Sequence, residues 1–300
     1  GTASGRWVGG QGRGMSQVQD QASKLRHGPT ATESRLRTIA ITSGKGGVGK
    51  TSLAVNLGLL LAGEGHRVAL FDGDMGLANV DVLLGLTPKF TLRHVVEGQK
   101  EIHDIMLRGP NGLYVIPASR GVEAMAHLAP AAQTRLLERL GQLEGLIDIL
   151  LLDTAAGISP NVLSLILAAD EAIVVTVPEP TAITDAYAVI KVLSRHRADP
   201  RAGILMNMVE GASQAEELFD QLRRVIRHFL QVEVGFVGHV LRDECVGRAV
   251  CEQKPFSICF PYARASRSLV DLARTLAASS RRGPQPEPFW NRMMYWAAQL

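Results

Sequence analysis

Gly-Lys-Gly-Gly-Val-Gly-Lys-Thr occupies residues 44–51 and decides the fold. An apolar run precedes it at residues 38–43, and residues 52–61 continue it as a helix-forming run. This order of strand, glycine-rich turn and helix is the context that a phosphate-binding loop requires. The glycines let backbone N–H groups surround phosphate oxygens, and the new helix directs its positive end at them. The stretch therefore predicts a nucleotide-binding α/β protein.

Within this loop, Lys50 is expected to reach the β- and γ-phosphates, and the hydroxyl of Thr51 is expected to be a ligand of Mg²⁺. The predicted ligands are accordingly ATP and Mg²⁺. The residues predicted to surround the phosphates are Gly44, Lys45, Gly46, Gly47, Val48, Gly49, Lys50, Thr51 and Ser52.

A lysine directly after the first glycine narrows the class. A general phosphate-binding loop leaves that position free, whereas Lys-Gly-Gly-x-Gly-Lys-Thr resembles the deviant loop of the MinD/ParA class of ATPases. In that class the extra lysine crosses a dimer interface to the nucleotide of the partner subunit. The resemblance implies that Lys45 acts in trans and that ATP drives formation of a homodimer. The alternative is a solvated lysine beside the loop.

Acidic residues follow two buried-strand patterns. Residues 67–72 end in Asp72 with Asp74 two positions on, and residues 146–153 end in Asp153. Ligands of open α/β sheets bind at the carboxyl ends of strands, where carboxylates suit a Mg²⁺ shell and a water-positioning group. Turn-forming or capping aspartates are the alternative. The resemblance assigns Asp74 to the attacking water, Asp72 to the outer metal shell and Asp153 to the Walker B role. The predicted catalytic residues are therefore Lys45, Lys50 and Asp74, and the predicted metal-site residues are Thr51, Asp72 and Asp153.

The adenine side of the predicted site rests on the resemblance. A strand pattern at residues 202–207 ends in Asn207, whose amide can donate and accept at once, and the class uses it to read the adenine edge. An asparagine that forms a turn is the alternative. After the next strand pattern, at residues 232–238, the class usually has a Pro-x-Asp turn under the base. Here Asp243 keeps the acid, and Leu241 stands where the proline is expected.

The alternation of apolar and amphipathic segments predicts one α/β domain, with a mostly parallel sheet flanked by helices on both faces, over residues 36–279. A length of 300 residues allows such a single domain. Residues 178–185 resemble a segment near the dimer face of the class, but no chemistry follows from them. Other strands are expected at residues 113–117 and 171–177, and other helices at residues 92–98, 133–143, 215–229 and 263–278.

Composition excludes several classes of protein. A hydrophobic content of 46% with 20% charged residues is that of a globular protein with a substantial core. The net charge of +3 permits contact with anionic lipid or nucleic acid without predicting either. The three cysteines lack the C-x-x-C spacing of a zinc site and do not form a disulfide framework. No stretch reaches the roughly 20 apolar residues of a membrane span, and no signal peptide is evident, so we expect a cytoplasmic protein.

A separate arm is predicted over residues 1–35. Residues 20–26 read Asp-Gln-Ala-Ser-Lys-Leu-Arg. They resemble the Asp-Gln-Ala-x-x-Leu-Arg element of the FlhG (FleN) group of flagellar-number regulators within the MinD class, which stimulates the signal-recognition-type GTPase FlhF. A solvated linker is the alternative. The resemblance offers Gln21 to the active site of the partner, and the residues expected to contact it are Asp20, Gln21, Ala22, Leu25 and Arg26.

The last segment, residues 280–300, is predicted to be a linker and an amphipathic helix. A helix over residues 289–300 would be about 18 Å long, too short to span a bilayer but able to lie in its interface. The MinD class carries a membrane-targeting helix at this end. A helix that packs back on the domain is the alternative. The residues expected to contact lipid are Phe289, Trp290, Met293, Met294, Trp296 and Leu300.

The resemblance implies a slow, Mg²⁺-dependent ATPase that regulates the number or placement of flagella. It would cycle between the cytosol and the inner face of the cytoplasmic membrane, with an FlhF-like GTPase, flagellar C-ring components and, in some members, a transcription activator as partners. The alternatives are a ParA-type DNA-segregation ATPase, a MinD-type division-site regulator, and an iron–sulfur carrier or synthetase with the same loop. The mild net charge argues against a ParA-type ATPase that binds DNA. The arm at residues 20–26 argues against a MinD-type division-site regulator, and the absence of a cysteine pair argues against an iron–sulfur carrier.

Overall fold

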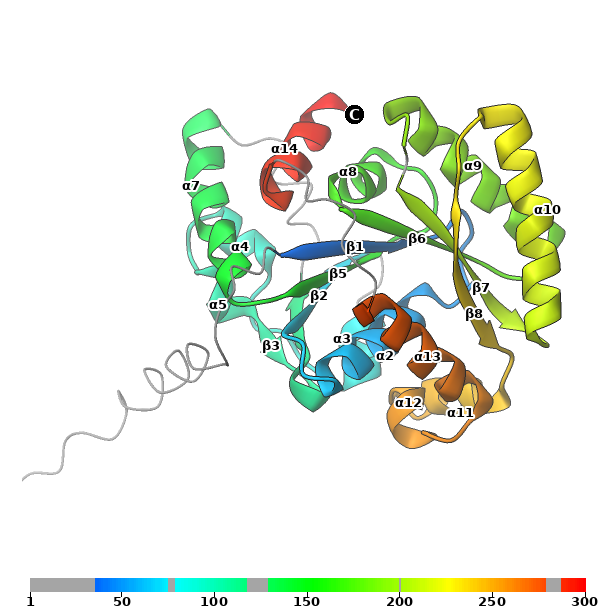
Figure 1. Cartoon of the computed structure of the whole chain (residues 1–300). Helices are drawn as coiled ribbons and strands as arrows, with labels where there is room; N and C mark the ends of the chain where they lie inside the picture. The colour runs from blue at the N-terminus through cyan, green and yellow to red at the C-terminus, as the bar shows by residue number, and fades with distance from the viewer. Residues whose placement is uncertain (1–35, 75–78, 118–128, 200, 279–286) are drawn as a thin grey trace, which may run out of the picture. The chain divides into compact units, whose positions relative to one another are not determined.

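The computed structural model describes residues 36–74, 79–117, 129–199, 201–278 and 287–300 (Figure 1). The predicted GTPase-activating segment at residues 20–26 lies outside the described residues. So does most of the linker before the last helix.

An eight-stranded sheet forms the centre of the domain, in the order β3-β4-β2-β5-β1-β6-β7-β8. Neighbouring strands pair in parallel, except that β3 pairs antiparallel with β4. This arrangement confirms the predicted fold class. The strands are β1 (Arg37–Thr42), β2 (Val68–Gly73), β3 (Leu107–Arg108), β4 (Tyr114–Pro117), β5 (Ile149–Thr154), β6 (Glu171–Thr176), β7 (Ala202–Val209) and β8 (Gly235–Leu241).

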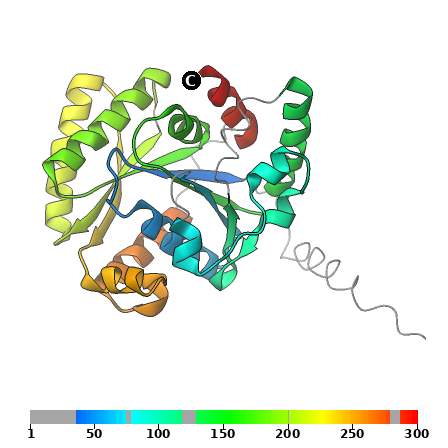
Figure 2. The same cartoon turned by 180° about the vertical axis from the view of Figure 1, so that it is seen from behind.

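Helices cover both faces of the sheet, as Figures 1 and 2 show from opposite sides. One face, below the sheet in Figure 1, carries α2 (Lys50–Gly63), α3 (Asn79–Leu84), α11 (Glu244–Cys251), α12 (Phe256–Cys259) and α13 (Arg264–Ala278). The other carries α4 (Leu92–Val96), α5 (Ile102–Ile105), α7 (Pro130–Gly141), α8 (Pro160–Ala168), α9 (Pro180–His196), α10 (Ala212–Leu230) and α14 (Phe289–Gln299). Two short 3₁₀ turns, η1 (Pro110–Gly112) and η2 (Gln142–Gly145), complete the described elements.

The central strands are buried on both sides, which explains their continuous apolar sequences. In β1, Ile39 and Ile41 pack into the core on the α2 side, and Ala40 between them packs into the core on the α8 side. Register then aligns the carboxyl ends of neighbouring strands, because Asp153 of β5 pairs with Ile41 of β1 and with Asp72 of β2. The fold thus brings the phosphate-binding loop and two predicted acids to one edge of the sheet.

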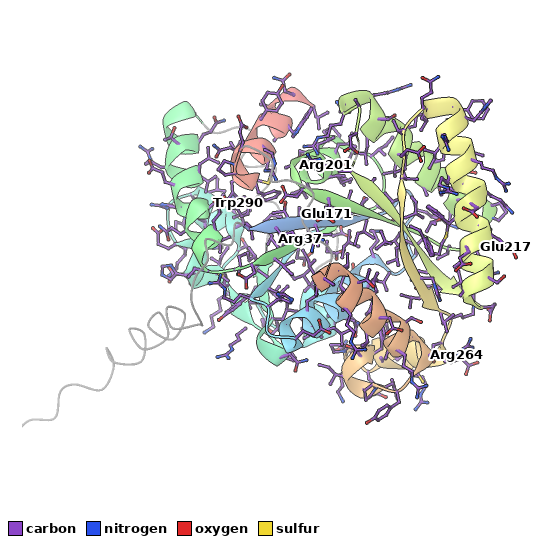
Figure 3. The ribbon with its side chains drawn as sticks, in the orientation of Figure 1. Arg37, Glu171, Arg201, Glu217, Arg264 and Trp290 are labelled. Atoms are coloured by element: carbon purple, nitrogen blue, oxygen red, sulfur yellow. The ribbon has the colours of Figure 1, made fainter. Side chains whose placement is uncertain are left out.

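An ion pair joins the amino ends of β1 and β6, at the edge of the sheet opposite to the predicted site. Arg37, at the start of β1, donates to the carboxylate of Glu171 at 2.7 Å and to the carbonyl of Leu276 at 2.6 Å. Figure 3 labels Arg37 and Glu171 close together, near the centre of the view. These bonds tie β1, β6 and the last turn of α13 together at the end away from the predicted site.

The strand predicted at residues 232–238 is displaced along the chain. The structure places β8 at residues 235–241, and its pairing with β7 begins where Gly235 meets Gly203. Gln231 ends α10 in the left-handed conformation, with φ 57°. The apolar residues Val232 and Val234 are buried in the connection, so their pattern reflects packing rather than strand pairing. In the described parts of the chain, no helix is long and apolar enough to cross a membrane.

Candidate nucleotide-binding site

The loop between β1 and α2 has the backbone that a phosphate-binding turn needs. Gly49 takes the N-cap position of α2 in the left-handed region, with φ 91°. A Cβ on Gly49 would lie 2.6 Å from Nδ2 of Asn207, and a Cβ on Gly44 would overlap the backbone carbonyl of Asp185. Glycine is therefore required at both of these positions, and the first turn of α2 supplies the N–H groups, without helical partners, that a phosphate-binding turn uses.

Lys50 and Asp153 form the buried floor of the site. Lys50 is 8% exposed and Asp153 is fully buried. Burial lowers the pKa of Lys50, while the charges of Asp153 and Asp74 oppose that shift. Burial raises the pKa of Asp153 to about 7, against the opposing effects of the Thr51 hydroxyl and of Lys50. Two charged groups with so little solvent are stabilised by ligands of opposite charge, here phosphate oxygens and a cation.

Among the described residues, none donates a well-aligned hydrogen bond to either carboxylate oxygen of Asp153, although the Thr51 hydroxyl is close enough to affect its pKa. Asp72 is 3% exposed on the adjacent strand, and its Oδ1 accepts the N–H of Asp74 at 3.4 Å. No group of three His, Cys, Asp or Glu side chains that could hold a metal occurs in the described residues. Mg²⁺ in phosphate sites is bound by one or two protein oxygens and completed by the phosphates, so this donor set fits it.

The structure also shows where the residues predicted on the adenine side lie. Asn207 is 5% exposed, and its Nδ2 donates to the carbonyl of Val48 at 2.8 Å, so it supports the loop directly. The carboxylate of Asp243 caps α11, accepting the N–H of Cys245 at 2.9 Å and that of Ala265 at 3.2 Å. Leu241 is the last residue of β8. Contact of Asn207 and Asp243 with a base stays a prediction, and both have structural roles that the sequence did not reveal.

Lys45 lies at the surface and is not part of this buried floor. It is 41% exposed, and its Nζ lies 2.7 Å from Oε2 of Glu179 and 3.3 Å from Oγ1 of Thr181. Sequence reasoning assigned no chemistry to residues 178–185, which supply both partners. The missing information was strand order: β6 lies beside β1, so the segment after β6 meets the phosphate-binding loop.

The predicted lipid-contacting helix, α14, is docked on the domain. Its residues Phe289, Trp290, Met293 and Met294 are buried, and the ring of Trp290 lies 5.9 Å from that of Phe71. Figure 3 labels Trp290. This is the alternative that the sequence left open. In this arrangement four of the six residues expected to meet lipid are covered, while Trp296 is partly exposed and Leu300 is 37% exposed.

A buried ion pair fixes α14 in this position. Arg292 is 6% exposed and donates to the carbonyl of Ala168 at 2.7 Å and to Oδ1 of Asp170 at 2.9 Å. The other oxygen of Asp170 accepts both the N–H and the hydroxyl of Thr38. The docked helix is thus connected through one carboxylate to the start of β1, the strand that carries the phosphate-binding loop.

Comparison with known proteins defines the class. Residues 39–256 match the model of the CobQ/CobB/MinD/ParA nucleotide binding domain. The chain therefore belongs to this family of nucleotide-binding P-loop proteins, as its fold and its loop indicate. Residues 44–51, the predicted phosphate-binding loop, lie within the matched range.

Among individual proteins, the chain is 45% identical to the antiactivator FleN of Pseudomonas aeruginosa over 80% of this chain and 85% of that protein. It is 32% identical to the flagellum site-determining protein YlxH of Helicobacter pylori, over 82% of this chain and 83% of that protein. The fold also matches a solved structure, the septum site-determining protein MinD from Pyrococcus horikoshii in complex with Mg-ADP. The TM-score is 0.64 and the sequence identity 25%, over 81% of this chain and 96% of that chain. The predicted resemblance to the FlhG (FleN) group of the MinD class is confirmed.

The glycine at the start of α2 gives a direct test of the loop. We expect Gly49→Ala to weaken binding of a fluorescent ATP analogue by at least about tenfold, because the left-handed backbone alone costs about 1–2 kcal/mol and the new Cβ meets Asn207. Gly65→Ala is the matched control, with a similar φ of 96° and nothing within 4 Å of the new Cβ. Equal affinity of the two variants would contradict the assigned loop geometry.

Proposed function

We propose that this chain is a Mg²⁺-dependent ATPase that dimerises in the ATP-bound state and regulates the number or placement of flagella. The observation that carries the proposal is the different environment of two lysines in one loop. Lys50 is buried beside Asp153, where it serves phosphates held by its own chain. Lys45 is exposed at the rim, where a second copy can meet it. Similarity to FleN and to the flagellar protein YlxH supports the flagellar role.

ATP and Mg²⁺ are the ligands that this family membership supports, in agreement with the Mg-ADP complex of the related MinD. When bound, Mg²⁺ neutralises charge that develops on the transferred phosphate. Thr51, Asp72 and Asp153 are the residues that would hold it, directly or through water. Lys50 contributes a fixed positive charge that burial keeps close to the phosphates.

Asp74 is the candidate for orienting the attacking water. It follows β2, is only partly buried, and lies close enough to Lys50 and Asp153 for their charges to interact. A carboxylate at the solvent side of the site can hold a water and accept its proton, whereas Asp72 and Asp153 are covered.

We expect Asp74→Ala to bind ATP and to dimerise as the wild type does, but to release phosphate at least about 100-fold more slowly, because a positioned general base contributes about that much. Phosphate release and light scattering on the same samples measure both properties. Asp271→Ala, a change at an 80% exposed acid of α13, is the control. Loss of dimerisation in Asp74→Ala would show that this residue has another role.

We also propose that α14 leaves its docked position to bind the inner surface of the cytoplasmic membrane. The covered face is the apolar one, so the helix must undock before lipid can replace the contacts with the domain. A single amphipathic helix binds weakly, and two helices of one dimer bind together with an avidity gain of roughly 10² or more. Pairing of two copies would therefore control membrane attachment.

Asp170→Asn tests this proposal without changing the helix itself. Removing one partner of a buried ion pair is strongly destabilising for the docked state, so we expect nucleotide-independent binding to anionic vesicles to rise about tenfold or more. Asp220→Asn makes the same charge change at an exposed acid of α10 and should leave binding unchanged. Removal of residues 289–300 should abolish binding in every background. Binding that persists after this truncation would exclude α14 as the lipid contact.

The remaining part of the proposal concerns residues 20–26 and an FlhF-like GTPase. Similarity to FleN and the Asp-Gln-Ala-x-x-Leu-Arg pattern support it. We expect Gln21→Ala to leave ATP turnover unchanged and to remove stimulation of GTP hydrolysis by the partner, whereas Gln17→Ala, outside the pattern, should preserve both. Stimulation that survives Gln21→Ala would reject this residue as the activating group.

A further inference from the structure

The amino-terminal part of α9 lies against the phosphate-binding loop. β6 pairs beside β1, with Val174 opposite Thr42, so the segments that follow these two strands are neighbours. A Cβ on Gly44 would overlap the carbonyl of Asp185, which shows how closely the two backbones approach. Lys45, the next residue of the loop, is bonded to Glu179 at the start of α9. The position of Lys45 therefore depends on this helix.

Glu179 occupies the N-cap position of α9 but does not cap it. Serine, threonine, aspartate or asparagine usually stands there and accepts a backbone N–H of the first turn. Glu179 makes no such hydrogen bond, and Pro180 after it has no N–H to offer. Its carboxylate instead accepts a hydrogen bond from the ammonium group of Lys45, with 2.7 Å between Nζ and Oε2. That hydrogen bond and the charge of Lys45 lower the pKa of Glu179.

The ammonium group of Lys45 lies in an electrostatically unfavourable position beside α9 unless Glu179 carries its negative charge. The amino end of a helix carries partial positive charge, so a lysine beside it is repelled. The Thr181 hydroxyl, at 3.3 Å, offers a neutral acceptor only. Arg242 also acts on the charge of Glu179, but Arg242 forms its own ion pair with Glu210 at 3.1 Å. Glu179 is thus the anion that holds Lys45 against α9.

We propose that Glu179 is a cis counter-ion for Lys45 and that it sets how readily two copies of the chain pair. The inference rests on the proposed function, in which Lys45 reaches the nucleotide of a second copy. To do so, Lys45 must exchange the carboxylate of Glu179 for phosphate oxygens. Each dimer breaks two such pairs, one in each copy, so Glu179 opposes pairing until ATP is bound on both sides.

The exposure of the pair sets the size of this effect. Lys45 is 41% exposed and Glu179 is 56% exposed. An ion pair in such a position shifts an equilibrium by no more than about fivefold, so two of them shift the dimer dissociation constant by up to about 25-fold at low salt. This is small enough for bound ATP to overcome. It is large enough to keep the chain monomeric at concentrations where an unrestrained Lys45 would allow pairing.

Glu179→Gln removes the charge and keeps the side chain nearly the same size. Sedimentation velocity over a range of protein concentrations, with Mg²⁺ and a slowly hydrolysed ATP analogue, measures the dimer dissociation constant. We expect it to fall by up to about 25-fold in Glu179→Gln and to stay at the wild-type value in Asp220→Asn, whose ion pair is with Arg223 on α10. The difference between wild type and Glu179→Gln should shrink as salt rises, because exposed ion pairs are screened.

Pairing of Glu179→Gln that is equal to or weaker than that of the wild type would overturn the inference and leave the proposed function intact. A gain that does not change with salt would also overturn it, because it would come from a rearranged α9. A wild-type chain that stays monomeric with the ATP analogue would reject the proposed function and the inference together. Thr181→Val, which removes the neutral acceptor, is the second variant. It should strengthen pairing about twofold, and weaker pairing would count against the inference.

Discussion

Burial of two opposite charges under one glycine-rich loop is the constraint on which this structure depends. Lys50 and Asp153 are held at the carboxyl ends of the sheet by strands that are apolar on both faces. Solvent is excluded from both groups, and their burial shifts the pKa of each toward its neutral form. Phosphate oxygens beside Lys50 and a cation beside Asp153 would stabilise the charged forms of these two buried side chains. The fold therefore favours nucleotide binding before any particular partner is considered.

The same loop places its other lysine in a different environment. Lys45 remains at the surface and is bonded to Glu179 at the start of α9, the helix that follows the neighbouring strand. At the opposite end of the sheet, Asp170 joins Thr38 of β1 to Arg292 of α14. Strand β1 thus leads at its carboxyl end to the loop that carries Lys45, and its amino end is linked through Asp170 to the docked helix α14. Each contact includes an ion pair, Lys45 with Glu179 and Arg292 with Asp170. In the proposed function, a second copy replaces the first pair and a lipid surface the second.

Sequence pattern was sufficient for the fold and for the floor of the site. The loop at residues 44–51 and the apolar runs ending in Asp72 and Asp153 predicted strand ends that the structure brings together. Strand order, however, is a tertiary property, so the meeting of Lys45 with Glu179 could not be read from residues 134 positions apart. The apolar pattern of α14 was equally compatible with lipid and with the domain, because both bury the same face. Val232 and Val234 misled the strand assignment, since burial without pairing gives the same alternation.

Molecular mass in solution tests the central claim most directly. Light scattering of the purified chain with saturating ATP and Mg²⁺ should give the mass of a dimer, about twice the 32.3 kDa of one chain, and Lys45→Ala should give that of a monomer. A wild-type chain that remains monomeric, or a Lys45→Ala chain that dimerises equally well, would contradict the account and leave a nucleotide-binding protein without the proposed switch.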